Sequence, residues 1–141
     1  MEIAVGLLLS AIIVFLFYQS KQTAAKWPAS NYLLELEGKN FFCYNNKKDV
    51  QDAIEIILIP LLASNFEIIF LNGKNPESDY EEWLIKHILY NFKHYSKFPH
   101  LFKVRNGEII ELSINNEFYN TIDQNKPMSA LINIIDAFFA L

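Results

Sequence analysis

A long uncharged run near the start of the chain limits what this sequence can fold into. Residues 3–18 carry no charged side chain. At about 1.5 Å per residue they would form about 24 Å of helix, and an extension to Ser20 would make it about 27 Å. Because a bilayer core is about 30 Å thick, the run predicts a membrane-spanning helix within residues 1–20.

Other interpretations of this run fit less well. A secretory signal peptide needs Lys or Arg before its apolar stretch, and the only preceding charge is Glu2. The stretch at residues 23–25 matches a cleavage site only loosely. A buried core helix is disfavoured because no polar stripe interrupts the run. Signal-peptide or lipoprotein-like processing remains the alternative to an uncleaved anchor.

The charges flanking the run predict its orientation. Lys21 and Lys26 follow the run, and no basic residue precedes it. The positive-inside rule therefore places the C-terminal part of the chain in the cytoplasm. The single cysteine, Cys43, fits a reducing compartment. We expect a single-pass membrane protein whose C-terminal domain is cytoplasmic.

The rest of the chain predicts one globular domain. Of the 141 residues 52% are hydrophobic, which argues against a disordered tail. Residues 21–31 form a polar linker that contains Pro28, and residues 32–141 form the domain. The chain has 12 Lys and Arg against 16 Asp and Glu. Nucleic acid is therefore not an expected partner, because phosphate binding needs a surplus of cations.

The first half of the domain predicts two strands with a helix between them. A short aromatic strand covers residues 41–44, and Asp49 is a suitable N-cap for a helix that follows. This helix runs to Leu62, is kinked by Pro60, and is apolar almost all round at residues 56–59, so we expect it to be mostly buried. The clearest strand covers residues 66–71.

The second half predicts a helix, a hairpin and a last helix. The helix starts after Ser78 or Asp79 and continues to Tyr95. Two apolar runs flank Asn106-Gly107, a strong signal for a β-hairpin. The last helix begins at Pro127 and carries one apolar stripe. This order predicts an α/β domain with a mixed four-stranded sheet and flanking helices.

This pattern resembles the thioredoxin-like fold over about residues 40–141. Residues 97–109 look like the closing hairpin of that family, in which a cis-proline opens the first strand and a glycine turn leads to the second. Pro99 and Gly107 occupy these positions, and Pro60 resembles a proline of the first core helix. The resemblance implies a cis bond into Pro99.

The redox centre of that family is missing. Its chemistry needs two cysteines at the start of the helix after the first core strand, and only Cys43 is present. Cys43 falls inside the predicted strand, which is typical of a small buried apolar residue. The resemblance therefore implies a redox-inactive module that binds protein, with no cofactor. Family members bind extended polypeptide beside the cis-proline, which predicts a groove lined by Phe98, Pro99, Tyr44, Asn45, Asn46, Lys47 and Lys48.

Two alternatives stay open at this stage. Cys43 could be the nucleophile of a monothiol enzyme in peroxide or glutathione chemistry. The chain could also be a structural subunit of a membrane assembly, since Gly6 and Ser10 would let the anchor helix pack closely against another. The three histidines, His87, His94 and His100, predict a solvated face rather than a zinc site.

Overall fold

The computed structural model describes residues 11–13, 31–93 and 95–140. The chain divides into two units, residues 1–35 and 36–141. In the first unit, residues 11–13 and 31–35 are helical. Within the described part of the chain, no helix combines the length and the apolar character needed to span a bilayer. The predicted anchor lies outside the described residues except at residues 11–13.

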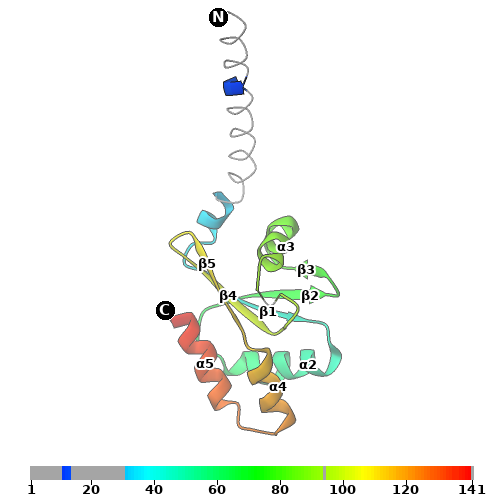
Figure 1. Cartoon of the computed structure of the whole chain (residues 1–141). Helices are drawn as coiled ribbons and strands as arrows, with labels where there is room; N and C mark the ends of the chain where they lie inside the picture. The colour runs from blue at the N-terminus through cyan, green and yellow to red at the C-terminus, as the bar shows by residue number, and fades with distance from the viewer. Residues whose placement is uncertain (1–10, 14–30, 94, 141) are drawn as a thin grey trace, which may run out of the picture. The chain divides into compact units, whose positions relative to one another are not determined.

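The second unit is built on a mixed sheet of five strands in the order β3-β2-β1-β4-β5 (Figure 1). β1 and β2 are parallel, whereas the other neighbouring pairs are antiparallel. The α/β class is confirmed, but the prediction of four strands was wrong because β3 is a three-residue edge strand that contains Pro76. The strands are β1 (Asn40–Asn45), β2 (Glu67–Asn72), β3 (Asn75–Glu77), β4 (His100–Arg105) and β5 (Glu108–Ser113).

The crossover between β1 and β2 contains three kinds of helical winding instead of one kinked α-helix. α2 (Lys48–Asp52) is followed by a π-helix, η1 (Ala53–Leu58), and a 3-10 helix, η2 (Ile59–Leu61). Lys47, not Asp49, is the N-cap residue. The winding changes ahead of Pro60, which has no N–H to donate to the Ile56 carbonyl.

The prediction that this helix is mostly buried at residues 56–59 is confirmed for Leu58 but was wrong for Ile56 and Ile57. Ile54 and Leu58 are buried against the sheet, whereas 72% of Ile56 and 46% of Ile57 are exposed. A helix on one face of a sheet buries a single stripe. The additional isoleucines therefore remain at the surface.

Three further helices complete the domain, namely α3 (Glu82–Tyr90), α4 (Asn115–Asp123) and α5 (Ser129–Ala140). α3 begins later than predicted and ends at Tyr90, before the expected end at Tyr95. α4 was not predicted. The apolar stripe of α5 is confirmed, with its members Leu131, Ile135 and Phe139 buried.

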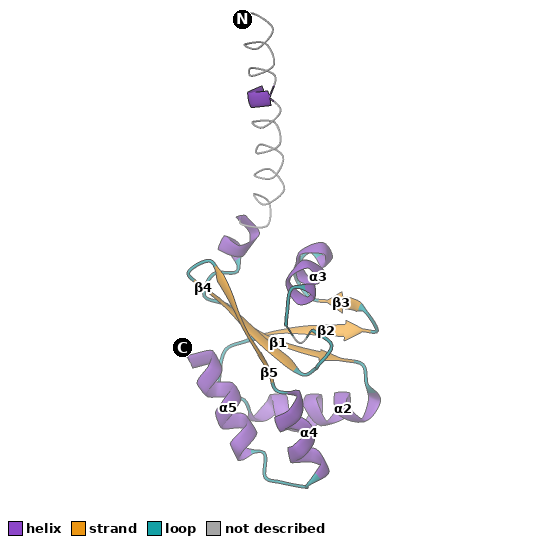
Figure 2. Ribbon diagram, viewed as in Figure 1, coloured by secondary structure: helices purple, strands orange, loops and turns teal. Residues whose placement is uncertain are grey.

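The helices cover both faces of the sheet (Figures 1 and 2). α2, α4 and α5 lie on one face, and α3 lies on the other. On the first face, Phe42, Tyr44 and Leu101 of the sheet pack in one core with Ile54, Phe118 and Ile135 from the helices. On the second face, Phe102 stacks on Phe41 and makes an edge contact with Phe92.

The predicted hairpin at Asn106-Gly107 is confirmed. Both residues have positive φ, 55° and 73°, as a two-residue turn of type I′ requires. The Glu37 carboxylate accepts hydrogen bonds from the N–H groups of Asn106 and Gly107. These two bonds, together with the charge of Arg105, lower the pKa of Glu37.

Candidate functional site

The residues predicted to form a groove meet at one edge of the sheet. β1 ends at this edge and β4 begins there, and Cys43 pairs with His100 in the antiparallel register. Tyr44 follows Cys43 in β1, and Pro99 directly precedes His100, the first residue of β4. The peptide bond between Phe98 and Pro99 is cis, as the resemblance implied.

Asn45 and Asn46 serve mainly to shape the loop after β1. The Asn46 N–H donates to the Leu71 carbonyl at 3.1 Å, and its Oδ1 accepts from the Gly73 N–H at 3.2 Å. Asn45 Oδ1 accepts from the Lys47 N–H at 3.3 Å, which is an Asx-type turn. Asn46 thus ties the end of β1 to the end of β2.

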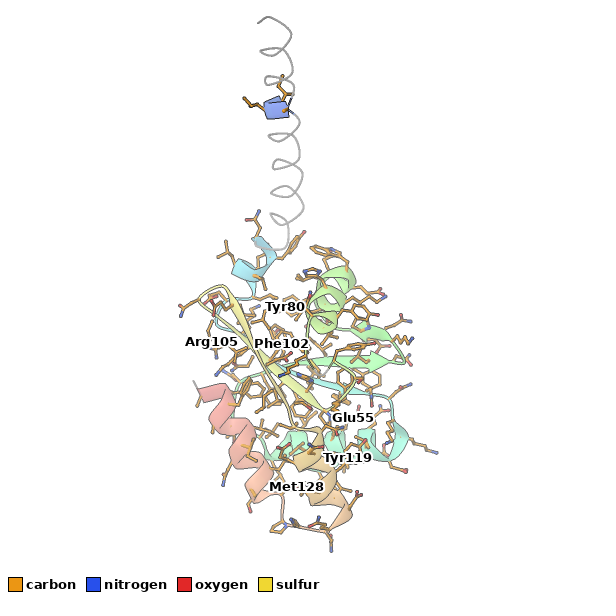
Figure 3. All side chains as sticks on the ribbon, in the orientation of Figure 1. Glu55, Tyr80, Phe102, Arg105, Tyr119 and Met128 are labelled. Carbon is orange, nitrogen blue, oxygen red and sulfur yellow. The ribbon has the colours of Figure 1, made fainter. Side chains whose placement is uncertain are left out.

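Tyr44 and Lys47 make contacts on the α2 and α4 side of the sheet. The buried Tyr44 hydroxyl donates to Glu55 Oε1 at 2.8 Å, and burial together with the Glu55 charge raises the pKa of Tyr44. Lys47 Nζ donates to the Tyr119 hydroxyl at 3.2 Å and lies 5.0 Å from the ring centroid. Figure 3 shows Glu55 and Tyr119 on this side. Lys48 is exposed, as Lys47 is, but takes no part in these contacts.

The backbone around Pro99 is partly engaged within the domain. Pro99 is buried, and its carbonyl accepts from the Ile114 N–H at 3.1 Å. The Phe98 carbonyl accepts from Asn115 Nδ2 at 2.6 Å. A carbonyl has a second lone pair, and no described residue accepts a hydrogen bond from the Phe98 N–H. Phe98 as a residue is half-buried, and its N–H is the backbone donor of this segment that has no acceptor among the described residues.

Asn115 is a site residue that sequence reasoning missed. It stands at the first position of α4, which itself was not predicted. The preference of asparagine for helix starts was the available signal, but nothing in the sequence related it to Phe98.

Cys43 lies in the core and not at the surface. Its exposed fraction is 0%, and burial strongly raises the pKa of its thiol. A nucleophilic cysteine needs a lowered pKa and access to its substrate. Neither condition is met at Cys43 in this structure.

The histidines do not form the solvated face that was predicted. His87 is exposed on α3, but His100 is completely buried on β4, and His94 lies outside the described residues. His100 stacks on Phe92, with ring centroids 4.6 Å apart, and its Nε2 lies 3.7 Å from Glu111 Oε2. Over the described residues, no group of three His, Cys, Asp or Glu side chains is placed to hold a metal ion.

A small hollow opens beside Phe98 on the α3 side of the sheet. Its volume is about 40 Å³, which is enough for the end of a small aliphatic side chain. Two of its lining residues are lysines, and most of the others are apolar or aromatic. The lining consists of Leu71, Gly73, Lys74, Lys86, Leu89, Tyr90, Tyr95 and Phe98.

A larger hollow of about 360 Å³ lies at the starts of β1 and β2, the opposite end of these strands from Phe98. Its two charged lining residues, Lys39 and Glu67, are joined through the hydroxyl of Tyr80. Lys39 Nζ donates to the Tyr80 hydroxyl at 2.7 Å, and this hydroxyl donates to Glu67. Burial and the bond to Glu67 raise the pKa of Tyr80 (labelled in Figure 3). The two charged groups of this hollow are therefore engaged within the domain.

Comparisons with known proteins add no assignment, since no family model, curated protein or solved structure matches this chain.

Proposed function

We propose that this chain is a membrane-anchored, redox-inactive module of thioredoxin-like fold that binds a protein partner. The partner would contact the edge where β1 ends and β4 begins, beside Phe98 and Pro99. The function is binding or scaffolding, and no reaction is part of the proposal.

The order of the elements supports the fold part of the proposal. Strands β2, β1, β4 and β5 are adjacent in this order, with β1 and β2 parallel and with the β4–β5 hairpin antiparallel to β1. A helical crossover joins β1 to β2, α3 precedes the hairpin, and α5 ends the domain. These are the relations that the resemblance implies for residues 40–141.

The observation that carries the binding function is the contrast between Cys43 and Phe98. The thiol is buried, with 0% exposure, whereas Phe98 is only half-buried beside a hollow and its N–H has no hydrogen-bond acceptor among the described residues. An extended segment of a partner could accept this hydrogen bond and place a side chain in the hollow.

Crosslinking in cells tests this proposal. The full chain, Phe98→Ala and Ile134→Ala are compared. Ile134 is a matched control because it is an apolar residue, 39% exposed, on α5. We expect crosslinked partners to be lost from Phe98→Ala and kept by Ile134→Ala, with unchanged circular dichroism for both. An unchanged partner set in a folded Phe98→Ala variant would refute the proposed site.

The anchor is tested separately. It is supported by the uncharged residues 3–18 and by Lys21 and Lys26 behind them. We expect the full chain to stay in the membrane fraction after carbonate extraction, and a variant that lacks residues 1–20 to be released. If the shortened variant also loses every partner, the contacts belong to the anchor, as expected for a structural subunit of a membrane assembly.

A further inference from the structure

The hollow beside Phe98 has a chemistry that points to one kind of ligand. Lys74 and Lys86 contribute the two charges of its lining, and none of its lining residues, all of them described, is acidic. The chain as a whole has a formal net charge of −4. A cationic hollow in an acidic protein favours a carboxylate ligand through charge complementarity.

The two ammonium groups are available to such a ligand. Lys74 is exposed in the turn after β2, and no described carboxylate forms an ion pair with it. Lys86 Nζ lies 2.5 Å from Glu82 Oε1 one turn away on α3, with side chains 36% and 59% exposed. Exposed pairs of this spacing are weak, so a second carboxylate can share or displace Glu82.

The size of the hollow limits what enters it. A volume of about 40 Å³ holds the end of a valine-sized side chain and not a nucleobase. Leu71, Leu89 and Phe98 provide the apolar contacts for such a group. The ligand therefore has to combine a small apolar part with negative charge, and an extended peptide can present both side by side.

We propose that the partner segment is acidic, with a small aliphatic side chain in the hollow and neighbouring carboxylates on Lys74 and Lys86. This inference rests on the proposed function, because it specifies the partner at the same edge of the sheet.

The test uses the full chain in a mild non-ionic detergent and three fluorescein-labelled, capped peptides. Each peptide has a central valine followed by two glutamates, two glutamines or two lysines within a glycine–serine decamer. Binding is measured by fluorescence anisotropy. We expect the glutamate peptide to bind at least about tenfold more tightly than the glutamine peptide, and to weaken at high salt because screening shortens the reach of the lysine charges.

Three variants assign the effect to individual residues. Lys74→Glu should weaken the glutamate peptide about tenfold, as expected when an attractive charge becomes repulsive. Glu82→Gln should strengthen it about two- to threefold, because Lys86 loses its competing partner. Lys126→Glu is the matched control and should change nothing, since Lys126 is an exposed lysine between α4 and α5.

The outcomes separate this inference from the proposed function. If the glutamine peptide binds as tightly as the glutamate peptide and Phe98→Ala abolishes both, the acidic preference is wrong and the docking edge remains. If no peptide binds, the inference is wrong, and the crosslinking of Phe98→Ala decides the proposed function independently. If phosphatidylserine vesicles alone bind and Lys74→Glu releases them, the surface recognises lipid and the peptide inference is overturned.

Discussion

Replacing Lys103 by methionine should leave the free energy of unfolding almost unchanged, although this lysine is buried and well connected. Lys103 lies on β4 and is only 4% exposed. Its Nζ donates to the Phe138 carbonyl at 2.6 Å and lies 4.6 Å from the centroid of the Phe138 ring. Phe138 is in the last turn of α5, where carbonyl groups lack partners within the helix.

The magnitudes of the opposing effects lead to this expectation. A hydrogen bond to a charged group contributes about 1.5–3 kcal/mol, and a cation–π contact contributes about 0.5–2 kcal/mol. Removing an ammonium from water costs several kcal/mol, which offsets these gains. Burial, with the nearby Arg105 charge, lowers the pKa of Lys103. This is the direction expected when the hydrogen bond and the cation–π contact do not fully offset the desolvation of the ammonium. Because the two gains and the desolvation cost nearly cancel, we expect Lys103→Met to change the free energy of unfolding by less than about 1 kcal/mol.

The matched variant Lys103→Ala isolates the packing of the side-chain stem. Besides the ammonium, Lys103→Ala removes three buried methylene groups of the stem. At about 0.8 kcal/mol for each group, its free energy of unfolding should be about 2–3 kcal/mol lower than that of Lys103→Met. Urea denaturation of the full chain, followed by far-ultraviolet circular dichroism, measures both values. A loss above about 2 kcal/mol for Lys103→Met, with no further loss for Lys103→Ala, would refute the cancellation.

The lowered pKa adds a pH dependence with a definite sign. Between the folded-state pKa of Lys103 and its ordinary value of 10.5, the unfolded chain binds more protons at this residue than the folded domain. Stability rises with pH wherever the unfolded state binds more protons. The native chain should therefore gain stability relative to Lys103→Met as the pH rises through this window.

Three further predictions concern other parts of the domain. Phe118→Ala should destabilise the fold by about 3–5 kcal/mol, because Phe118 is the large buried side chain of α4. Ile122→Ala, on the exposed side of α4, should cost less than about 1 kcal/mol. Equal losses in urea denaturation would contradict this difference in burial. Cys43 should react with a thiol reagent such as Ellman's reagent only when the chain unfolds, and rapid stoichiometric labelling of the native chain would show that it is not sealed. Hydrogen bonds from two backbone N–H groups lower the pKa of Glu37, so the free energy of unfolding should fall as the pH drops below 4.5 through the folded-state pKa of this residue. Glu37→Gln should reduce that fall. An identical acid dependence of both proteins would argue against the carboxylate contact.

Elements with strong local signals were predictable from the sequence. Asn106-Gly107 predicts a hairpin because only certain residues adopt two successive positive φ angles, and the stripe on α5 follows from helical spacing. α4 gives a weak signal because only Phe118 and Thr121 of its residues are buried. β3 is short and contains a proline, so propensity argues against it although pairing with β2 stabilises it.

The candidate site was predictable in its position but not in its contacts. The order of strands brings residues 44–48 and 98–99 to one edge, which a sequence pattern can anticipate. Which groups remain open there depends on tertiary contacts, such as the bond from Asn115 to the Phe98 carbonyl. The burial of His100 and the exposure of Ile56 likewise depend on which helix covers each face, and hydrophobicity alone does not determine it.

These contacts divide the predicted edge into a closed side and an open side. On the α4 side, Tyr44 is bonded to Glu55 and Lys47 is bonded to Tyr119. The Phe98 carbonyl accepts from Asn115 of α4, and the Pro99 carbonyl accepts from Ile114, the residue before α4. On the α3 side lie the half-buried Phe98 and the hollow lined by Lys74 and Lys86. A partner that approached from the α4 side would first have to break these hydrogen bonds, at about 1 kcal/mol or more each. Approach from the α3 side requires only the displacement of water and the sharing of Lys86, so partner binding should depend on Lys74 and not on Lys47.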